Sequence, residues 1–298
     1  MKYSFGLPKT AWILSMGFLL GGTSLFAQEN VSKVKTSLNA YSFNEPLSKG
    51  TMNLDDLLDY CALAGFDAVD ITAYYFPGYP VVPTDEYLYH IKKKAFLLGL
   101  EISGTGVRND FTHPDPLVRQ KSTALVKEWI LAAEKLGAPV IRIFAGQSNT
   151  EGYTREEVLD WLVKDVKECV DFGKNHGVMV AIQNHHDFIE NADQAIEIIE
   201  RVDSEWMGLI LDTGSYWTGD SYEQISRSIP YTVNWQIKPN TYMNGMEEKL
   251  DLVRLLEIIK SSGYRGYIPL ETLDPGDPVP IVNQFFAEVQ EALKVVFD

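Results

Sequence analysis

Apolar and polar positions alternate in a regular way from residue 36 to the end of the chain. Short runs rich in β-branched residues are each followed by a longer stretch whose apolar positions recur at helical spacing, such as residues 53–64 and 114–136. We count eight such pairs, and this order predicts a parallel sheet with helices between its strands. Eight units without a linker between them favour closure into a single (β/α)8 TIM barrel. The expected strands begin near Thr36, Ala68, Glu101, Pro139, Val178, Met207, Thr232 and Gly266.

Glycines mark the expected ends of the helices. At five places a glycine follows a helical stretch and precedes a strand, where a helix commonly ends with a residue in the left-handed backbone conformation. The five are Gly65, Gly99, Gly137, Gly177 and Gly263. A doubly wound open sheet is the alternative, but its first strand usually leads into a glycine-rich phosphate turn. Residues 41–45, Tyr-Ser-Phe-Asn-Glu, are not such a turn, so we expect no nucleotide cofactor. Pro269 argues against the eighth strand because proline cannot donate to a ladder.

The first 27 residues have a different pattern. Lys2 and Lys9 precede or border the apolar residues 11–20, and small residues then lead to Ala27, which is the layout of a secretory signal peptide. The apolar stretch is shorter than the roughly 20 residues of a membrane-spanning helix, although an uncleaved anchor is the alternative. We therefore expect residues 1–27 to be a signal peptide, residues 28–298 to form the barrel domain, and the mature protein to be exported, periplasmic or secreted.

The net negative charge of the chain limits the kinds of molecule that it is expected to bind. Removal of residues 1–27 takes away two lysines and no acid, so 24 basic and 41 acidic residues leave a net charge of −17. Such a surface repels nucleic acid and anionic membranes, and no basic patch is visible in the sequence. A small molecule is the expected partner, and the oligomeric state is left open. Cys61 and Cys169 lie in separate helical patterns, which favours lone buried thiols over a disulfide.

Polar residues follow apolar runs at four expected strand ends, and the carboxyl ends of barrel strands meet at the mouth. Their oxygen atoms could surround one divalent cation of the Mg²⁺, Mn²⁺ or Ca²⁺ type, since hard cations prefer such ligands. Zinc fits less well because no cysteine and few histidines are placed to bind it. Taken singly, each residue also has an ordinary structural explanation, such as a cap or a hydrogen bond inside the barrel. The four are Gln183, Asp212, Gln236 and Glu271.

Alternation along the seventh strand predicts a polar inner face. Trp235 and Ile237 should face the helices, whereas Asn234, Gln236 and Lys238 should face the barrel interior. A polar inner face costs stability unless something uses it.

A second pair of inward charges suggests a structural role. Asp70 and Arg142 each lie between apolar neighbours on the second and fourth strands, so we expect a buried ion pair across the barrel. Replacing Asp70 by alanine would then cost about 3–5 kcal/mol.

Four stretches give the chain a family resemblance, which extends from about Thr36 to the end. They are Gln-Asn-His-His-Asp at 183–187, Leu-Asp-Thr-Gly-Ser-Tyr at 211–216, Asn-Trp-Gln-Ile-Lys at 234–238 and residues 263–271, Gly-Tyr-Arg-Gly-Tyr-Ile-Pro-Leu-Glu. These stretches resemble an exported branch of the xylose-isomerase-like barrel superfamily, which includes sugar-phosphate isomerases, ketose 3-epimerases and inosose dehydratases.

The resemblance implies a site as well as a fold. In many relatives the corresponding strand ends supply Glu, Asp, His and Glu to a divalent metal, and the two Glu act as acid and base beside a hydroxy-ketone. Asp212 and Glu271 match this pattern, but Gln183 stands at the first Glu position and Gln236 at the His position. An amide cannot act as a general base, so a symmetrical two-base epimerisation needs another group, and metal affinity should fall.

The leading hypothesis is proton removal next to a carbonyl of a sugar or keto-sugar, with or without a metal. Glu271 is the expected base, Asp212 holds the metal or orients the substrate, and Lys238 stabilises an enediolate oxygen. His185 is the candidate second proton carrier, although an exposed or substrate-binding role is an equal alternative, and His186 is expected to be structural. Expected substrate contacts are Tyr41, Asn109, Asn184 and Trp235, and the loop at 104–111, with Arg108 or Asn109, should help cover the mouth.

Other functions stay open at this point. Isomerisation, epimerisation and elimination from an oxidised (3-keto) glycoside all begin with the same proton removal. A different class is a non-catalytic sugar-binding barrel with a decayed metal site, in which aromatic residues provide stacking surfaces. A nuclease fits least, because five histidines and a strongly acidic surface do not suit its metal ligands and substrate. The candidate stacking residues are Tyr74, Tyr75, Phe76 and Trp235.

Overall fold

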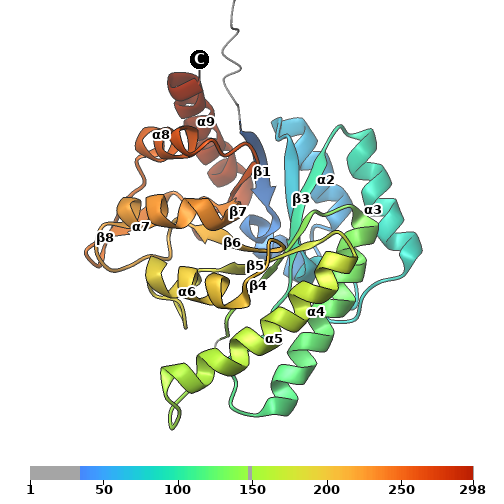
Figure 1. The fold of residues 1–298 in the computed structure, drawn as a ribbon. Helices are drawn as coiled ribbons and strands as arrows, with labels where there is room; N and C mark the ends of the chain where they lie inside the picture. Colours follow the sequence, from blue (N-terminus) through green and yellow to red (C-terminus); the bar gives the residue numbers. More distant parts are fainter. Residues whose placement is uncertain (1–33, 147–149, 298) are drawn as a thin grey trace, which may run out of the picture. The chain divides into compact units, whose positions relative to one another are not determined.

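Eight parallel strands form the central sheet of the protein in a computed structural model, which describes residues 34–146 and 150–297 (Figure 1). The strand order is β10-β1-β2-β3-β4-β5-β6-β7, so each strand pairs with its neighbour in the sequence except where β10 meets β1. Every predicted strand is confirmed, with its start within one residue of the expected position. Their bounds are β1 Lys35–Asn39, β2 Ala68–Thr72, β3 Glu101–Gly106, β4 Val140–Ile143, β5 Met179–Gln183, β6 Met207–Asp212, β7 Thr232–Gln236 and β10 Tyr267–Leu270.

The two ends of the sheet meet at a short seam between β7 and β10. Ile237 bridges to Leu270, its N–H donates to Pro269 O at 2.8 Å, and Glu271 N–H donates to Ile237 O at 2.9 Å. In a parallel ladder the next bond would run from the nitrogen of residue 269 to Trp235 O, and a proline cannot supply it. Pro269 therefore shortens the seam without preventing closure, and the (β/α)8 barrel is the fold.

Helices cover the outer face of the strands (Figure 1). Side-chain caps begin several of them, including Asn53 for α2 and Thr154 for α5, and both form complete capping boxes. All five glycines predicted to end helices have positive φ, from 66° to 90°, as a left-handed terminal residue requires. The helices are α1 Asn44–Lys49, α2 Leu54–Ala64, α3 Asp85–Leu97, α4 Pro116–Leu136, α5 Arg155–Asn175, α6 Ala192–Val202, α7 Ser221–Ser228, α8 Leu252–Ser262 and α9 Pro278–Phe297.

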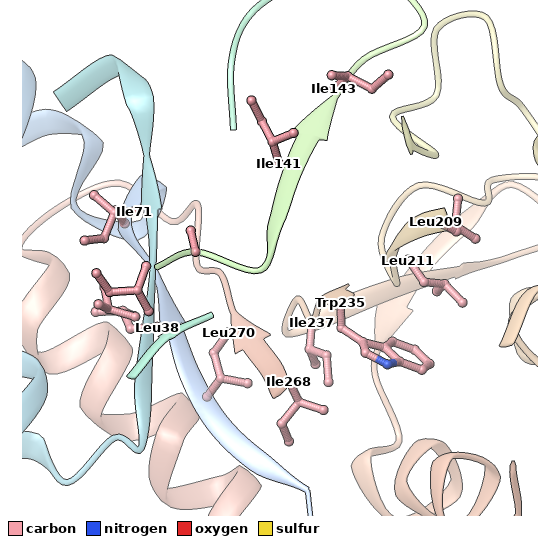
Figure 2. Close-up of a cluster of buried hydrophobic side chains, with 14 of the residues drawn as sticks. Leu38, Ile71, Ile141, Ile143, Leu209, Leu211, Trp235, Ile237, Ile268 and Leu270 are labelled. Atoms are coloured by element: carbon pink, nitrogen blue, oxygen red, sulfur yellow. The ribbon is translucent and has the colours of Figure 1, made fainter. Parts of the chain in front are cut away.

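Alternate strand residues build two separate cores. Side chains that leave the strands on the helix side join the main cluster, and Figure 2 labels ten of them, among them Leu209, Leu211, Trp235 and Ile237. The prediction that Trp235 and Ile237 face the helices is confirmed. A much smaller apolar cluster, with Val140, Ala181 and Ile210 as its buried members, lies on the opposite face of its strands. Because so few apolar side chains fill the barrel interior, polar strand residues on that face can contact one another across the barrel.

The expected ion pair between Asp70 and Arg142 is not formed. Asp70 Oδ2 instead accepts a 3.4 Å hydrogen bond from Asn234 Nδ2, and Arg142 donates to Val107 O at 2.7 Å and to the Tyr74 hydroxyl at 3.0 Å. Burial raises the pKa of Asp70 to about 6, although the Arg142 charge acts to lower it. Arg142 thus points toward the barrel mouth, one layer away from Asp70.

A small hairpin after β7 was not predicted. Its strands, β8 (Asn240–Met243) and β9 (Met246–Lys249), pair antiparallel around Asn244 and Gly245, which both have positive φ. Asn-Gly between short runs is a strong hairpin signal, so the sequence did contain this information.

Other predictions concern single residues and the N-terminus. Both cysteines are buried and free, as expected. The proposed signal peptide, residues 1–27, lies outside the described residues. Ser32–Asp298 groups as one compact unit. Within residues 34–146 and 150–297, no helix has the length and apolar character to cross a membrane.

Candidate active site

A cavity of about 330 Å³ opens where the strands end. Seven different strands or their following loops contribute to its wall, as expected for an α/β barrel. The lining residues are Asn39, Tyr41, Thr72, Tyr74, Arg108, Arg142, Phe144, Gln183, His185, Gln236, Lys238, Glu271 and Leu273.

Asp212, at the end of β6, accepts most of the hydrogen bonds in the polar network under this cavity. It is fully buried, and its Oδ2 accepts hydrogen bonds from Gln183 Nε2 and Lys238 Nζ, both at 2.8 Å. Its Oδ1 accepts from Gly214 N–H at 2.9 Å. A buried carboxylate costs stability unless its oxygens are paired, and here both oxygens of Asp212 accept hydrogen bonds.

Lys238 lies between two carboxylates. Its Nζ is 2.8 Å from Asp212 Oδ2 and 3.6 Å from Glu271 Oε2. Burial alone would lower the pKa of Lys238, but the charges of Asp212 and Glu271 outweigh burial and raise it above its ordinary value. A Cβ on Gly214 would come within 2.8 Å of Lys238 Cδ, so the glycine leaves the space that the lysine stem occupies.

Glu271 follows β10 directly and is buried at the cavity wall. Burial raises the pKa of Glu271, and the Asp212 charge adds to this effect, while Lys238, a hydrogen bond with Gln236 and Arg142 act to lower it. The net pKa lies above the usual range of a glutamate. A carboxylate of this kind is a stronger base than an exposed one, which suits proton abstraction.

The four strand-end residues predicted to bind a cation do come together, but their arrangement does not fit a divalent metal. Gln183 turns its amide nitrogen, not its oxygen, toward Asp212, and Lys238 donates to the same carboxylate oxygen. Gln236 forms a hydrogen bond with Glu271. The described residues hold no group of three or more His, Cys, Asp or Glu side chains suited to a metal ion. We therefore derive no step through a metal.

The two histidines after β5 have different surroundings. His185 lines the cavity, packs edge-on against Phe144 with ring centroids 4.5 Å apart, and has its Nδ1 3.5 Å from Asp187 Oδ2. His186 has a positive φ of 59° and stacks on Trp217. His185 is therefore the histidine that can meet a molecule in this cavity.

Three of the predicted substrate contacts do not line the cavity. Asn109 clamps the backbone of Phe144 through two hydrogen bonds, and Asn184 makes a reciprocal pair with the backbone of Asp212. Trp235 is buried among the helix-facing side chains. The strand pattern could not show this, because the partners of both asparagines are backbone atoms of a neighbouring strand end. Tyr41 does line the cavity.

Arg142 and Phe144 are wall residues that the sequence analysis did not identify as such. The Arg142 guanidinium lies 4.0 Å from the Phe144 ring centroid and bonds to Tyr74. A Cβ on Gly106 would approach the guanidinium to 2.8 Å, so this glycine makes room for it. Tyr74 was expected only as a stacking surface of a non-catalytic barrel. Asn39 and Thr72 end β1 and β2, so the strand-end rule applied to all eight strands would have found them.

A second cavity of about 450 Å³ adjoins the first, since His185, Lys238 and Leu273 line both. Its wall includes Trp217, which is 39% exposed, and Tyr242, whose ring centroid is 5.1 Å from that of Trp217. The unpredicted hairpin β8–β9 supplies Tyr242 and Glu247 to this wall.

The fold and this site define an α/β barrel whose mouth holds a polar, partly aromatic cavity for a small molecule. The chain belongs to the xylose isomerase-like TIM barrel family, whose model matches residues 58–294. This confirms the resemblance to the superfamily, whereas membership of an exported branch stays a prediction. The curated proteins contain no match to this chain.

Solved structures with the same fold are distant in sequence. D-psicose 3-epimerase from Clostridium cellulolyticum H10 is 17% identical, with a TM-score of 0.70, over 89% of this chain and 100% of that one. A 3-keto-D-glucoside 4-epimerase from E. coli is 14% identical, with a TM-score of 0.70, over 87% and 99%. A xylose isomerase domain protein from Planctomyces limnophilus is 15% identical, with a TM-score of 0.69, over 89% and 98%. At these identities the likeness shows the fold alone.

Proposed function

We propose that this protein is a sugar isomerase or epimerase-like enzyme that removes a proton from the carbon next to a carbonyl. The observation that carries the proposal is the pairing of Glu271, a buried carboxyl with a raised pKa, and the Lys238 ammonium at one polar cavity. Structures of the same fold include a D-psicose 3-epimerase and an L-ribulose 3-epimerase, which supports a small sugar as substrate.

The geometry suggests how the proton moves. Glu271 takes the proton from the substrate carbon, and the electron pair passes to the carbonyl oxygen, which becomes an enediolate oxygen. Lys238, fixed by Asp212, offers a positive charge to that oxygen as it forms. The charge is most valuable inside a buried site, because little water screens it.

His185 can return a proton from another side of the cavity. It follows β5, whereas Glu271 follows β10, and the shorter way around the barrel from one to the other passes β6 and β7. Its ring packs edge-on against Phe144, with its Nδ1 3.5 Å from Asp187 Oδ2. Glu271 and His185 together replace the two-glutamate arrangement that Gln183 rules out, because an amide cannot act as a general base.

Product analysis tests this proposal. Ketoses and aldoses of five and six carbons, and 3-keto-glucose, would be incubated with the wild type, with Glu271→Gln and with Glu248→Gln, a matched change on the exposed strand β9. We expect conversion of at least one sugar by the wild type and Glu248→Gln, and a loss of at least about 100-fold in Glu271→Gln. Equal rates in the wild type and Glu271→Gln would refute the role of Glu271, and binding without conversion of any sugar would favour the non-catalytic class.

A second reaction, elimination from a 3-keto glycoside, is favoured by the adjoining cavity. A glycoside carries a second group beyond its sugar ring, and Trp217 and Tyr242 offer aromatic faces for it. Glu271 would remove the C2 proton, the C1–C2 double bond would form as the C1–O bond breaks, and His185, at the border of both cavities, would protonate the leaving oxygen. The 3-keto-D-glucoside 4-epimerase of the same fold acts on a related class of sugar.

The two reactions leave different products. With a methyl 3-keto-glucoside as probe, elimination releases methanol and an unsaturated keto-sugar, whereas epimerisation keeps the methyl group attached. Trp217→Ala should weaken the binding of a phenyl 3-keto-glucoside more than that of 3-keto-glucose. Retention of the alcohol in every product would eliminate the second reaction.

We also propose, from the sequence alone, that the protein is exported. N-terminal sequencing of the mature protein should begin at or near Gln28, and a start at Met1 in protein from the native host would contradict export with cleavage.

A further inference from the structure

We infer that the Lys238 ammonium takes the place of a divalent cation at the mouth of this barrel. A side chain of the protein, and not a bound metal ion, then provides the positive charge of the site. The inference deepens the proposed function and rests on it for its catalytic meaning. Its structural content, however, concerns cation binding and can be measured without any substrate.

The position of the ammonium is the first argument. Lys238 Nζ lies 2.8 Å from Asp212 Oδ2 and 3.6 Å from Glu271 Oε2, so it is the group that the two carboxylates share. A hard cation would have to bind the same oxygens at about 2.0–2.6 Å. The ammonium and a metal cannot both occupy this space.

Charge balance is the second argument. Asp212 and Glu271 bring two negative charges to the site, while Lys238 brings one positive charge and Arg142 lies close enough to lower the pKa of Glu271. Lys238 therefore already offsets part of the negative charge of Asp212 and Glu271, and Arg142 acts in the same direction on Glu271 and on the nearby Asp70. A divalent ion would add two more positive charges to a buried region, where like charges repel strongly.

The neighbouring residues are shaped for the lysine, which is the third argument. Gln183 donates its amide N–H to Asp212 and leaves that carboxylate to hydrogen bonds instead of presenting an oxygen ligand. Lys238 N–H donates to Thr213 Oγ1 at 3.0 Å, which fixes the start of the side chain. Gly214 leaves room for its stem, because a Cβ there would come within 2.8 Å of Lys238 Cδ.

Metal binding by purified variants tests the inference. The wild type is compared with Lys238→Ala and with a triple variant, Gln183→Glu, Gln236→His and Lys238→Ala, which removes the ammonium and restores two ligands. Lys249→Ala is the matched control, since Lys249 is exposed on β9 and pairs with Glu288 at the surface. After treatment with EDTA and dialysis, bound Mn²⁺ is followed by electron paramagnetic resonance and the melting temperature is measured with and without 1 mM Mn²⁺.

The wild type and Lys249→Ala should bind no Mn²⁺ tighter than about 1 mM, and their melting temperatures should change by less than about 1 °C. The triple variant should bind one Mn²⁺ per chain at least about 100-fold more tightly and gain roughly 5 °C. Lys238→Ala alone should bind at least about 10-fold more tightly than the wild type, which keeps the test decisive if the triple variant does not fold.

Two results would overturn the inference. One is stoichiometric Mn²⁺, Mg²⁺ or Ca²⁺ on the wild type with Kd below about 1 mM. The other is a folded Lys238→Ala or triple variant that binds Mn²⁺ no better than the wild type. Neither result depends on turnover, so a failure here is distinct from a failure of the proposed reaction.

Discussion

Replacing Lys238 by methionine should destabilise the protein in a way that depends on pH. Methionine has a similar length and flexibility, so loss of packing contributes little. The change leaves Asp212 and Glu271 buried without the cation that they share at 2.8 and 3.6 Å. Removing one partner of a buried ion pair costs about 3–5 kcal/mol, and a barrel of this size loses roughly 2 °C in melting temperature per kcal/mol, so the expected fall is roughly 6–10 °C at pH 8.

Acidification should recover part of this loss. Burial already raises the pKa of Glu271, and without Lys238 the pKa rises further because the cation that lowered it is gone. An acid whose pKa is higher in the folded than in the unfolded state destabilises the fold when ionised, and this penalty disappears as the pH falls through the folded pKa. The deficit of Lys238→Met against the wild type should therefore be smaller at pH 5.5 than at pH 8.

Urea unfolding of the wild type, Lys238→Met and Lys249→Met at both pH values measures this effect. Lys249→Met should stay within about 0.5 kcal/mol of the wild type, because exposed pairs contribute little. A deficit below about 1 kcal/mol for Lys238→Met at pH 8, or a deficit equal at both pH values, would refute the reasoning.

Three further changes test other parts of the account. Asp70→Asn should stabilise the protein by up to about 3 kcal/mol at pH 8 and by much less at pH 4.5. The reason is that the pKa of Asp70 is raised to about 6, so the free-energy cost of burying its ionised form grows as the pH rises from about 4 to 6. Equal unfolding free energies of variant and wild type at both pH values would contradict this. Gly214→Ala should displace the stem of Lys238 and cost about 1–3 kcal/mol in thermal unfolding, and a melting temperature equal to that of the wild type would show that the space is not restricted. Asn109→Ala should cost about 2–3 kcal/mol by leaving the buried backbone of Phe144 without two partners, whereas a loss below about 0.5 kcal/mol in urea unfolding would mean that water replaces them.

The strand and helix pattern was predictable because each strand alternates between a helix-facing and an interior face, which leaves a regular trace in the sequence. The same trace placed Gln236 and Lys238 inside and Trp235 outside, as the structure has them. It also showed that residues at different strand ends meet, because all strands of a parallel barrel end at one rim.

Contacts between particular side chains were less predictable. The long side chain of Arg142 extends to the barrel mouth, where it bonds to Tyr74 and not to Asp70. The alternation of strand faces shows that a side chain points inward, but it does not show how far along the barrel axis a flexible side chain extends. Asn109 and Asn184 satisfy backbone atoms of neighbouring strand ends, and nothing in the sequence marks such partners. The shared position of Lys238 between two carboxylates likewise follows from three-dimensional register, since β6, β7 and β10 must bring their ends together first.

Deuterium incorporation from D₂O tests the central claim that Glu271 removes a proton next to a carbonyl. Each sugar that binds the protein would be incubated in D₂O with the wild type or Glu271→Gln, and the carbons beside the carbonyl would be followed by proton NMR. The account predicts loss of the proton signal at one such carbon with the wild type and at least about 100-fold slower loss with Glu271→Gln. Exchange at equal rates with both proteins, or no exchange of any bound sugar with the wild type, would contradict it.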